Sequence, residues 1–117
     1  MPPAPIAHVA LRNLETGALV ADVAMLIDSG ADITLVPRAS ADRLGVAVSA
    51  GAAYELIAFD GTRSVATSVK LDLHFLNRAF SGRFLLVDQD HGILGRDVLN
   101  HLRLLLDGPR STWTESV

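Results

Sequence analysis

Hydrophobic and polar positions alternate most regularly between Ser64 and Phe75, and this alternation predicts a β-strand with one buried face. One set of positions is mostly apolar or β-branched: Val65, Thr67, Val69, Leu71, Leu73 and Phe75. The other set is small or polar: Ser64, Ala66, Ser68, Lys70, Asp72 and His74. Asp60-Gly61 precedes the strand and is the strongest hairpin-turn dipeptide of the chain, so a partner strand is expected over Tyr54–Phe59.

Shorter apolar runs predict the remaining strands. Strands over Ile6–Arg12 and Ala18–Ile27 flank turn residues at Asn13–Gly17, which predicts a first hairpin. Three further runs predict strands, the last of them in the core: Ile33–Val36, Phe80–Val87 and Leu102–Leu106.

Two short helices complete the prediction. Pro37–Leu44 has proline where the first helical turn tolerates it, and Gly45 follows as a C-terminal cap. Asp97 is expected to cap a second helix from Val98 to about His101. Many short strands with one or two short helices, and no long amphipathic helix, predict an all-β domain that is closed or sandwich-like.

Length and composition exclude several classes of protein. The chain has 117 residues, half of them hydrophobic, which fits one globular domain. A net charge of −3 without a Lys/Arg cluster argues against nucleic-acid binding, and no apolar run reaches the ~18 residues of a membrane span. The absence of cysteine excludes disulfides and thiolate metal sites, and residues 1–13 do not resemble a signal peptide. A cytoplasmic protein is expected.

One carboxylate stands out because a core strand leads directly to it. The apolar run Val23–Ile27 ends at Asp28, Ser29 and Gly30 follow, and apolar character resumes at Ile33. A charge at the end of a buried strand is costly unless it has a partner or a task. Asp-Ser-Gly is also ordinary turn chemistry, so a purely structural turn is the alternative for Asp28.

A second motif lies about 65 residues further on, where Ile93-Leu94-Gly95-Arg96-Asp97 leads toward the second helix. The stretch Met25–Leu44 and the stretch Ile93–Leu106 echo one another, which suggests two similar halves about a pseudo-twofold axis. Leu26-Ile27-Asp28-Ser29-Gly30-Ala31-Asp32 and this second motif together resemble the retropepsin-type aspartic proteases, the single-lobe relatives of pepsin. The resemblance covers about Ile6 to Leu106 and implies a single-lobe, retropepsin-like closed β-barrel.

The resemblance implies an aspartic endopeptidase with Asp28 as the catalytic residue. That chemistry needs two carboxylates sharing a water, whereas the chain has one Asp-Ser-Gly and is too short for both lobes of pepsin, so a homodimer is expected. The residues that would support the active-site loop are Ser29, Gly30, Ala31, Asp32 and Arg96. Arg96 would pair with Asp32. Four residues would form the flap over a peptide or protein substrate: Phe59, Asp60, Gly61 and Thr62.

The same resemblance divides the chain into a flexible arm over residues 1–5, the protease domain over residues 6–108, and a tail over residues 109–117 that is a candidate for dimer contacts. No cofactor or metal is expected, because the four histidines are scattered without a metal-binding spacing. The flap tip carries a single glycine beside Asp60. A retropepsin-like module that dimerises or binds peptides with little or no proteolysis is therefore the alternative function.

Overall fold

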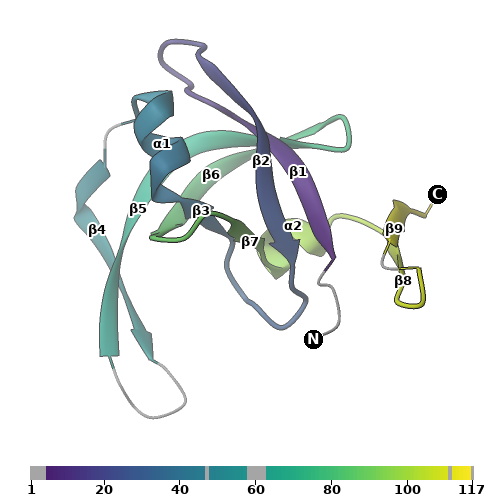
Figure 1. Cartoon of the computed structure of the whole chain (residues 1–117). Helices are drawn as coiled ribbons and strands as arrows, with labels where there is room; N and C mark the ends of the chain where they lie inside the picture. Colours follow the sequence, from purple (N-terminus) through teal and green to yellow (C-terminus); the bar gives the residue numbers. More distant parts are fainter. Residues whose placement is uncertain (1–4, 47, 58–62, 111, 117) are drawn as a thin grey trace.

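A computed structural model describes residues 5–46, 48–57, 63–110 and 112–116 of the chain. Six strands close into a barrel (Figure 1), in the order β1 (Ile6–Arg12), β2 (Leu19–Ile27), β7 (Gly92–Leu94), β3 (Leu35–Pro37), β6 (Arg78–Val87) and β5 (Arg63–Phe75). The barrel closes where β1 pairs with β5, and β4 (Val48–Ile57) adds to β5. The all-β retropepsin-like fold predicted from the sequence is therefore confirmed.

The strand order has an internal symmetry that the two sequence motifs anticipated. β2 pairs with β7 in parallel, and β6 pairs with β3 in parallel, so the two halves of the barrel exchange one short strand each. The exchanged strands β3 and β7 meet in antiparallel orientation at Leu35 and Ile93. The hairpin β1–β2 then corresponds to the hairpin β5–β6, which is the arrangement expected of a pseudo-twofold axis through the centre of the sheet.

The core lies inside the barrel and beneath α1 (Arg38–Leu44). β5 contributes Val69, Leu71 and Leu73, all fully buried, as its period-2 pattern predicted. The opposite set of positions is not uniformly exposed, because Asp72 is also buried and accepts a short hydrogen bond from the Ser81 hydroxyl. Ser68 belongs to the same set and is also buried, so the second face of β5 is partly covered.

Each half contains a hairpin, and each turn has an identifiable cause. Asn13 closes the first turn, where its side-chain oxygen accepts from the Glu15 amide at 2.9 Å and its amide group donates to the Leu44 carbonyl. Leu76 and Asn77 form a two-residue turn between β5 and β6, with φ of 53° and 61°. Positive φ at both positions is typical of the type I′ turn that suits the twist of paired strands.

Two predicted boundaries are shifted. The strand expected over Ile33–Val36 begins at Leu35, because Thr34 is engaged in hydrogen bonds with the second motif instead of a strand ladder. The second helix, α2, spans Arg96–Leu99 and begins before the predicted start, with Gly95 and not Asp97 at its N-cap. α1 ends as expected at Gly45, whose φ of 74° is left-handed.

The prediction of a final core strand over Leu102–Leu106 is wrong. β8 (Leu104–Asp107) pairs with β9 (Thr112–Glu115) in a separate two-stranded sheet beside the barrel (Figure 1). Leu105 and Leu106 are 62% and 51% exposed. Hydrophobicity alone suggested burial, but the barrel was already closed without this strand. α1 and α2, the helices of the described chain, are both far shorter than the ~20 residues needed to cross a bilayer.

Candidate active site

The carboxylate of Asp28 stands at the end of β2, on a loop that the second motif holds in place. Ile27 pairs with Leu94 of the parallel strand β7, and the Asp28 amide donates to the Leu94 carbonyl at 3.1 Å. On the other side, the Ile27 amide donates to the Pro5 carbonyl at 2.9 Å. Backbone hydrogen bonds therefore hold Ile27 to Pro5, before β1, and Asp28 to Leu94, on β7. The side chain of Asp28 remains partly exposed.

Within the described part of the chain, hydrogen bonds reach one oxygen of this carboxylate. Oδ1 of Asp28 accepts the backbone N–H of Gly30 at 2.9 Å, and the Ala31 amide donates to the Asp28 carbonyl at 3.2 Å. Among the described residues, Oδ2 has no hydrogen-bond partner. The bond from the Gly30 amide to Oδ1 is the one expected if Asp28 had only a structural role in the turn. It also orients the carboxylate and leaves Oδ2 available to a ligand. A Cβ at Gly30 would lie 3.2 Å from Oδ1, so a larger residue would crowd the same oxygen.

The predicted partners Asp32 and Arg96 do form an ion pair. Their side chains are 75% and 49% exposed, so the ion pair itself contributes little, at most about 1 kcal/mol. A backbone bond beside it is better protected: the Arg96 amide donates to the Ala31 carbonyl at 2.8 Å. The first turn of α2 is thereby joined to the loop that carries Asp28.

Thr34 and Asp97 form a second connection between the two motifs, and sequence reasoning assigned neither to the site. The Thr34 hydroxyl donates to Oδ1 of Asp97 at 2.6 Å, and the Thr34 amide donates to Oδ2 at 3.1 Å. The same hydroxyl accepts the Gly95 amide at 3.0 Å, and the Val98 amide also donates to Oδ1 of Asp97. Thr34 is completely buried. A lone hydroxyl within the apolar run Ile33–Val36 was the available signal, because buried hydroxyls need partners.

Glycine is required at position 95 by close packing and not by its backbone angle. A Cβ there would lie 2.6 Å from the carbonyl carbon of Ile33 and 3.0 Å from the carbonyl oxygen of Ala31. Real Cβ atoms do not approach backbone atoms so closely, so the two motif loops contact each other directly at this point. The two motifs predicted from the sequence are therefore brought together.

The other predicted site residues are placed only in part. Ser29 is exposed at the tip of the Asp28 loop. The predicted flap residues Phe59, Asp60, Gly61 and Thr62 lie outside the described residues, although β4 and β5 pair antiparallel up to Ile57 and Arg63 on either side of them. Asp28 thus has a defined setting, whereas the flap remains a prediction.

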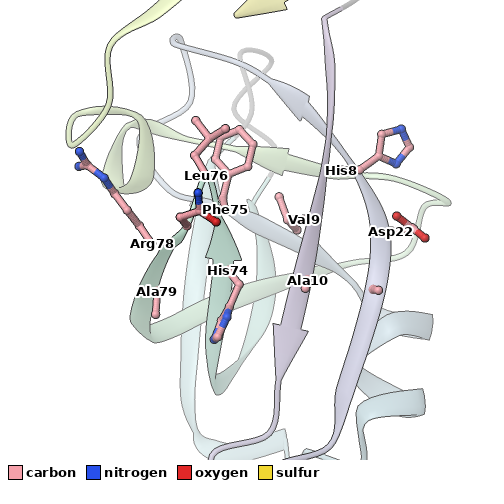
Figure 2. A pocket seen from close by; sticks show the side chains of 11 residues that line it. His8, Val9, Ala10, Asp22, His74, Phe75, Leu76, Arg78 and Ala79 are labelled. Atoms are coloured by element: carbon pink, nitrogen blue, oxygen red, sulfur yellow. The ribbon is translucent and has the colours of Figure 1, made fainter. Parts of the chain in front are cut away.

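A cavity of about 530 Å³ lies away from this loop, beside the bulge where β1 leaves β2 to pair with β5 (Figure 2). Its lining includes His8, Asp22 and His74. Asp22 precedes Asp28 by six residues of β2 and its loop, or roughly 20 Å of extended chain. Within the described residues, no group of three or more His, Asp or Glu side chains is arranged to hold a metal ion.

Comparison with known proteins now places the chain in a family. A family profile described as "Aspartyl protease" matches residues 14–98, which is more than half of the chain. The chain belongs to the aspartyl protease family. The matched region includes both motifs, Asp28 in the first and Arg96 in the second. A search of curated protein sequences finds no match.

Two solved protease structures share the fold. The protease of EIAV, solved with the inhibitor HBY-793, is 23% identical with a TM-score of 0.60, over 84% of this chain and 86% of that one. The retroviral protease-like domain of Ddi1 from Leishmania major is 19% identical with a TM-score of 0.51, over 96% of this chain and 89% of that one. The chain is therefore similar in fold to retroviral and retroviral-like proteases.

Proposed function

We propose that the protein is an aspartic endopeptidase that acts as a homodimer, with Asp28 of each chain at one shared centre. The observation that carries this proposal is the state of Asp28: the backbone orients its carboxylate, and Oδ2 has no partner among the described residues. Family membership supports the same assignment. Because the chain supplies one Asp-Ser-Gly motif, the second carboxylate of a catalytic pair has to come from a second copy.

The chemistry follows from bringing two carboxylates together. Two such groups ~3 Å apart cannot both ionise, so the pair shares one proton. The ionised Asp28 accepts a proton from a bound water, whose oxygen attacks the carbonyl carbon of the peptide bond. The protonated Asp28 gives its proton to the carbonyl oxygen, and a tetrahedral diol forms. The C–N bond then breaks as one carboxyl of the dyad gives a proton to the leaving nitrogen and the ionised carboxylate takes a proton from a diol hydroxyl, which yields a carboxylic acid and an amine and restores the singly protonated dyad.

The remaining residues of the site receive supporting roles in this proposal. Ser29 is exposed at the tip of the loop and would hydrogen-bond to the same loop of the second copy. Gly30 and Ala31 keep the loop small enough for a peptide backbone to approach Asp28. The ion pair of Asp32 and Arg96 would steady the loop. Phe59, Asp60, Gly61 and Thr62 would close over the substrate as a flap and exclude water.

The hairpin β8–β9 is the surface proposed to meet the second copy. The Trp113 indole N–H donates to the Ile6 carbonyl at 2.8 Å, and the Trp113 ring packs on Phe75 at 5.4 Å. Ile6 follows Pro5, whose carbonyl accepts from Ile27 beside the catalytic loop, so the hairpin lies on the same side of the barrel as Asp28. Exposed leucines on β8 would be covered when two copies bring their Asp28 loops together.

Cleavage of a peptide library by wild-type protein and by Asp28→Asn tests the proposal, between about pH 4 and 6, where one member of such a pair is ionised. Loss of the dyad's proton transfer is expected to lower kcat by about 10²–10⁴-fold. Asp90→Asn, at an exposed aspartate outside both motifs, is the matched control and is expected to retain activity.

Cleavage by Asp28→Asn at the wild-type rate would contradict the assignment. A wild-type dimer in sedimentation that binds peptides without cleaving them would instead support the alternative, a peptide-binding or dimerisation module. A cytoplasmic location and the absence of a nucleic-acid partner stay predictions from the sequence.

A further inference from the structure

Among the described strands, none pairs with one edge of β6 over most of its length. β3 pairs only with the last residues of β6, starting at Leu85, whose amide donates to the Thr34 carbonyl at 3.3 Å. The backbone groups of an antiparallel strand alternate in direction, so Ala79, Ser81 and Arg83 present theirs to the same side as Leu85. No described strand pairs with these residues on that side. An unpaired edge of this kind is a template for another strand.

A groove runs along this edge, between β6 and α2. It has a volume of about 750 Å³, and its apolar lining includes Phe80, Phe84 and Val98. Gly82 lies at the middle of this stretch, and a Cβ placed there would meet no atom within 4 Å. The fold therefore does not need a glycine at this position. Glycine within a strand often marks a place where another backbone comes close.

The rim of the groove is basic, although the chain as a whole carries a net charge of −3. Arg78 and Arg83 line the groove, and a neighbouring hollow of about 420 Å³ is lined by Arg78, His101 and Arg103. The Arg78 guanidinium donates to the His101 carbonyl at 2.7 Å, and Figure 2 shows this side chain extending away from His8 and Asp22. The acidic residues lining these two hollows are Asp97, which is already hydrogen-bonded to Thr34, and Glu115.

We propose that the open edge of β6 binds an extended, acidic segment of a partner protein, which adds to the sheet as one more strand. Backbone hydrogen bonds to Ala79, Ser81 and Arg83 would provide affinity, as in other cases of strand addition. Arg78 and Arg83 are five residues apart, or roughly 17 Å, on opposite faces of the strand. They select a segment with carboxylates about five residues apart and apolar side chains between them.

This site is separate from Asp28 and does not depend on catalysis, so its test uses the Asp28→Asn protein. The probe is a blocked, fluorescein-labelled octapeptide with Asp at position 2, Glu at position 7, and alternating Val and Thr between them. Fluorescence anisotropy is expected to show binding that weakens about 10-fold or more when both acidic residues of the probe are replaced by Lys. Arg83→Glu is expected to weaken binding similarly, whereas Arg43→Glu on α1, also exposed, should leave it unchanged.

Gly82→Val tests the groove itself, because the new side chain would stand in the groove beside the added strand, in space that the side chains of the peptide need, and would meet nothing in the fold. Its melting temperature should match the parent, and its affinity for the probe should fall about 10-fold or more. Retained binding in both Gly82→Val and Arg83→Glu, or no binding of the probe at all, would overturn the proposal.

Hydrogen exchange identifies the bound edge residue by residue. The amides of Ala79, Ser81 and Arg83 are expected to exchange fast in the free protein and slowly with the probe bound. The amides of Phe80 and Gly82 point to β5 and should be slow in both states. Protection of all five without the probe would show that a second copy covers this edge, and that result would also overturn the proposal.

Discussion

Replacing Thr34 by valine removes the central group of the network that joins the two motifs. Valine has nearly the same shape, so the change deletes a hydroxyl without opening a large cavity. Asp97 would lose the donor at 2.6 Å, and the Gly95 amide would lose its acceptor at 3.0 Å. Thr34 and Gly95 are both buried, so water cannot readily replace the bond that the Gly95 amide loses, whereas the exposed carboxylate of Asp97 can be solvated in part.

The free-energy cost follows from these two losses. A hydrogen bond to a charged group contributes roughly 1.5–3 kcal/mol, and a buried donor left unsatisfied costs about 1–3 kcal/mol. Since the losses share one hydroxyl and the loop will relax in part, we expect Thr34→Val to destabilise the protein by about 2–4 kcal/mol. For a domain of this size that corresponds to a fall in Tm of roughly 10 °C.

Urea and thermal unfolding followed by circular dichroism measure this change, at one fixed protein concentration because a dimer's stability depends on concentration. Thr114→Val, at an exposed position of β9, is the control and is expected to stay within about 0.5 kcal/mol of wild type. A cycle with Asp97→Ala should show coupling above about 1 kcal/mol, because the two side chains are bonded. A Thr34→Val protein as stable as the control would refute the reasoning that this network holds the loops together.

Two further predictions concern close packing and the hairpin. Gly95→Ala is expected to lower the free energy of unfolding by more than about 2 kcal/mol, because the new Cβ would lie 2.6 Å from a backbone carbon. Gly82→Ala has open space around it and should change the free energy of unfolding by no more than about 0.5 kcal/mol. Equal melting temperatures for the two variants would contradict this prediction. Trp113→Phe keeps the ring contact and loses the indole bond at 2.8 Å, so unfolding should show a loss of about 1 kcal/mol, and no change would mean that the bond to β1 does not hold the hairpin.

Local patterns predicted much of the barrel. The alternation that ends at Phe75 marked β5 correctly because Val69, Leu71, Leu73 and Phe75 all face the core, and Gly45 marked the end of α1 because it adopts a left-handed conformation. The ion pair of Asp32 with Arg96 was also anticipated, as a role implied by the resemblance to the retropepsin-type proteases. These predictions succeeded where one residue type is suited to one local geometry.

Other features depend on contacts between distant segments and could not be read in this way. Thr34 appeared to belong to a strand, because the apolar run around it continues on both sides, yet Asp97 and Gly95 take up its hydrogen bonds. Leu105 and Leu106 were expected in the core, because hydrophobicity does not distinguish a residue buried in its own barrel from one exposed on an added hairpin.

The parallel pairing of β2 with β7 also bears on the order in which the protein can fold. The Asp28 loop is fixed by Leu94 and Arg96, far downstream in the chain, so none of these bonds can form while only the first half of the protein has been synthesised. Contacts of such long sequence separation make folding slow. A nascent chain would therefore carry an unformed Asp28 loop until α2 has left the ribosome, and translation itself would delay the ordering of this carboxylate.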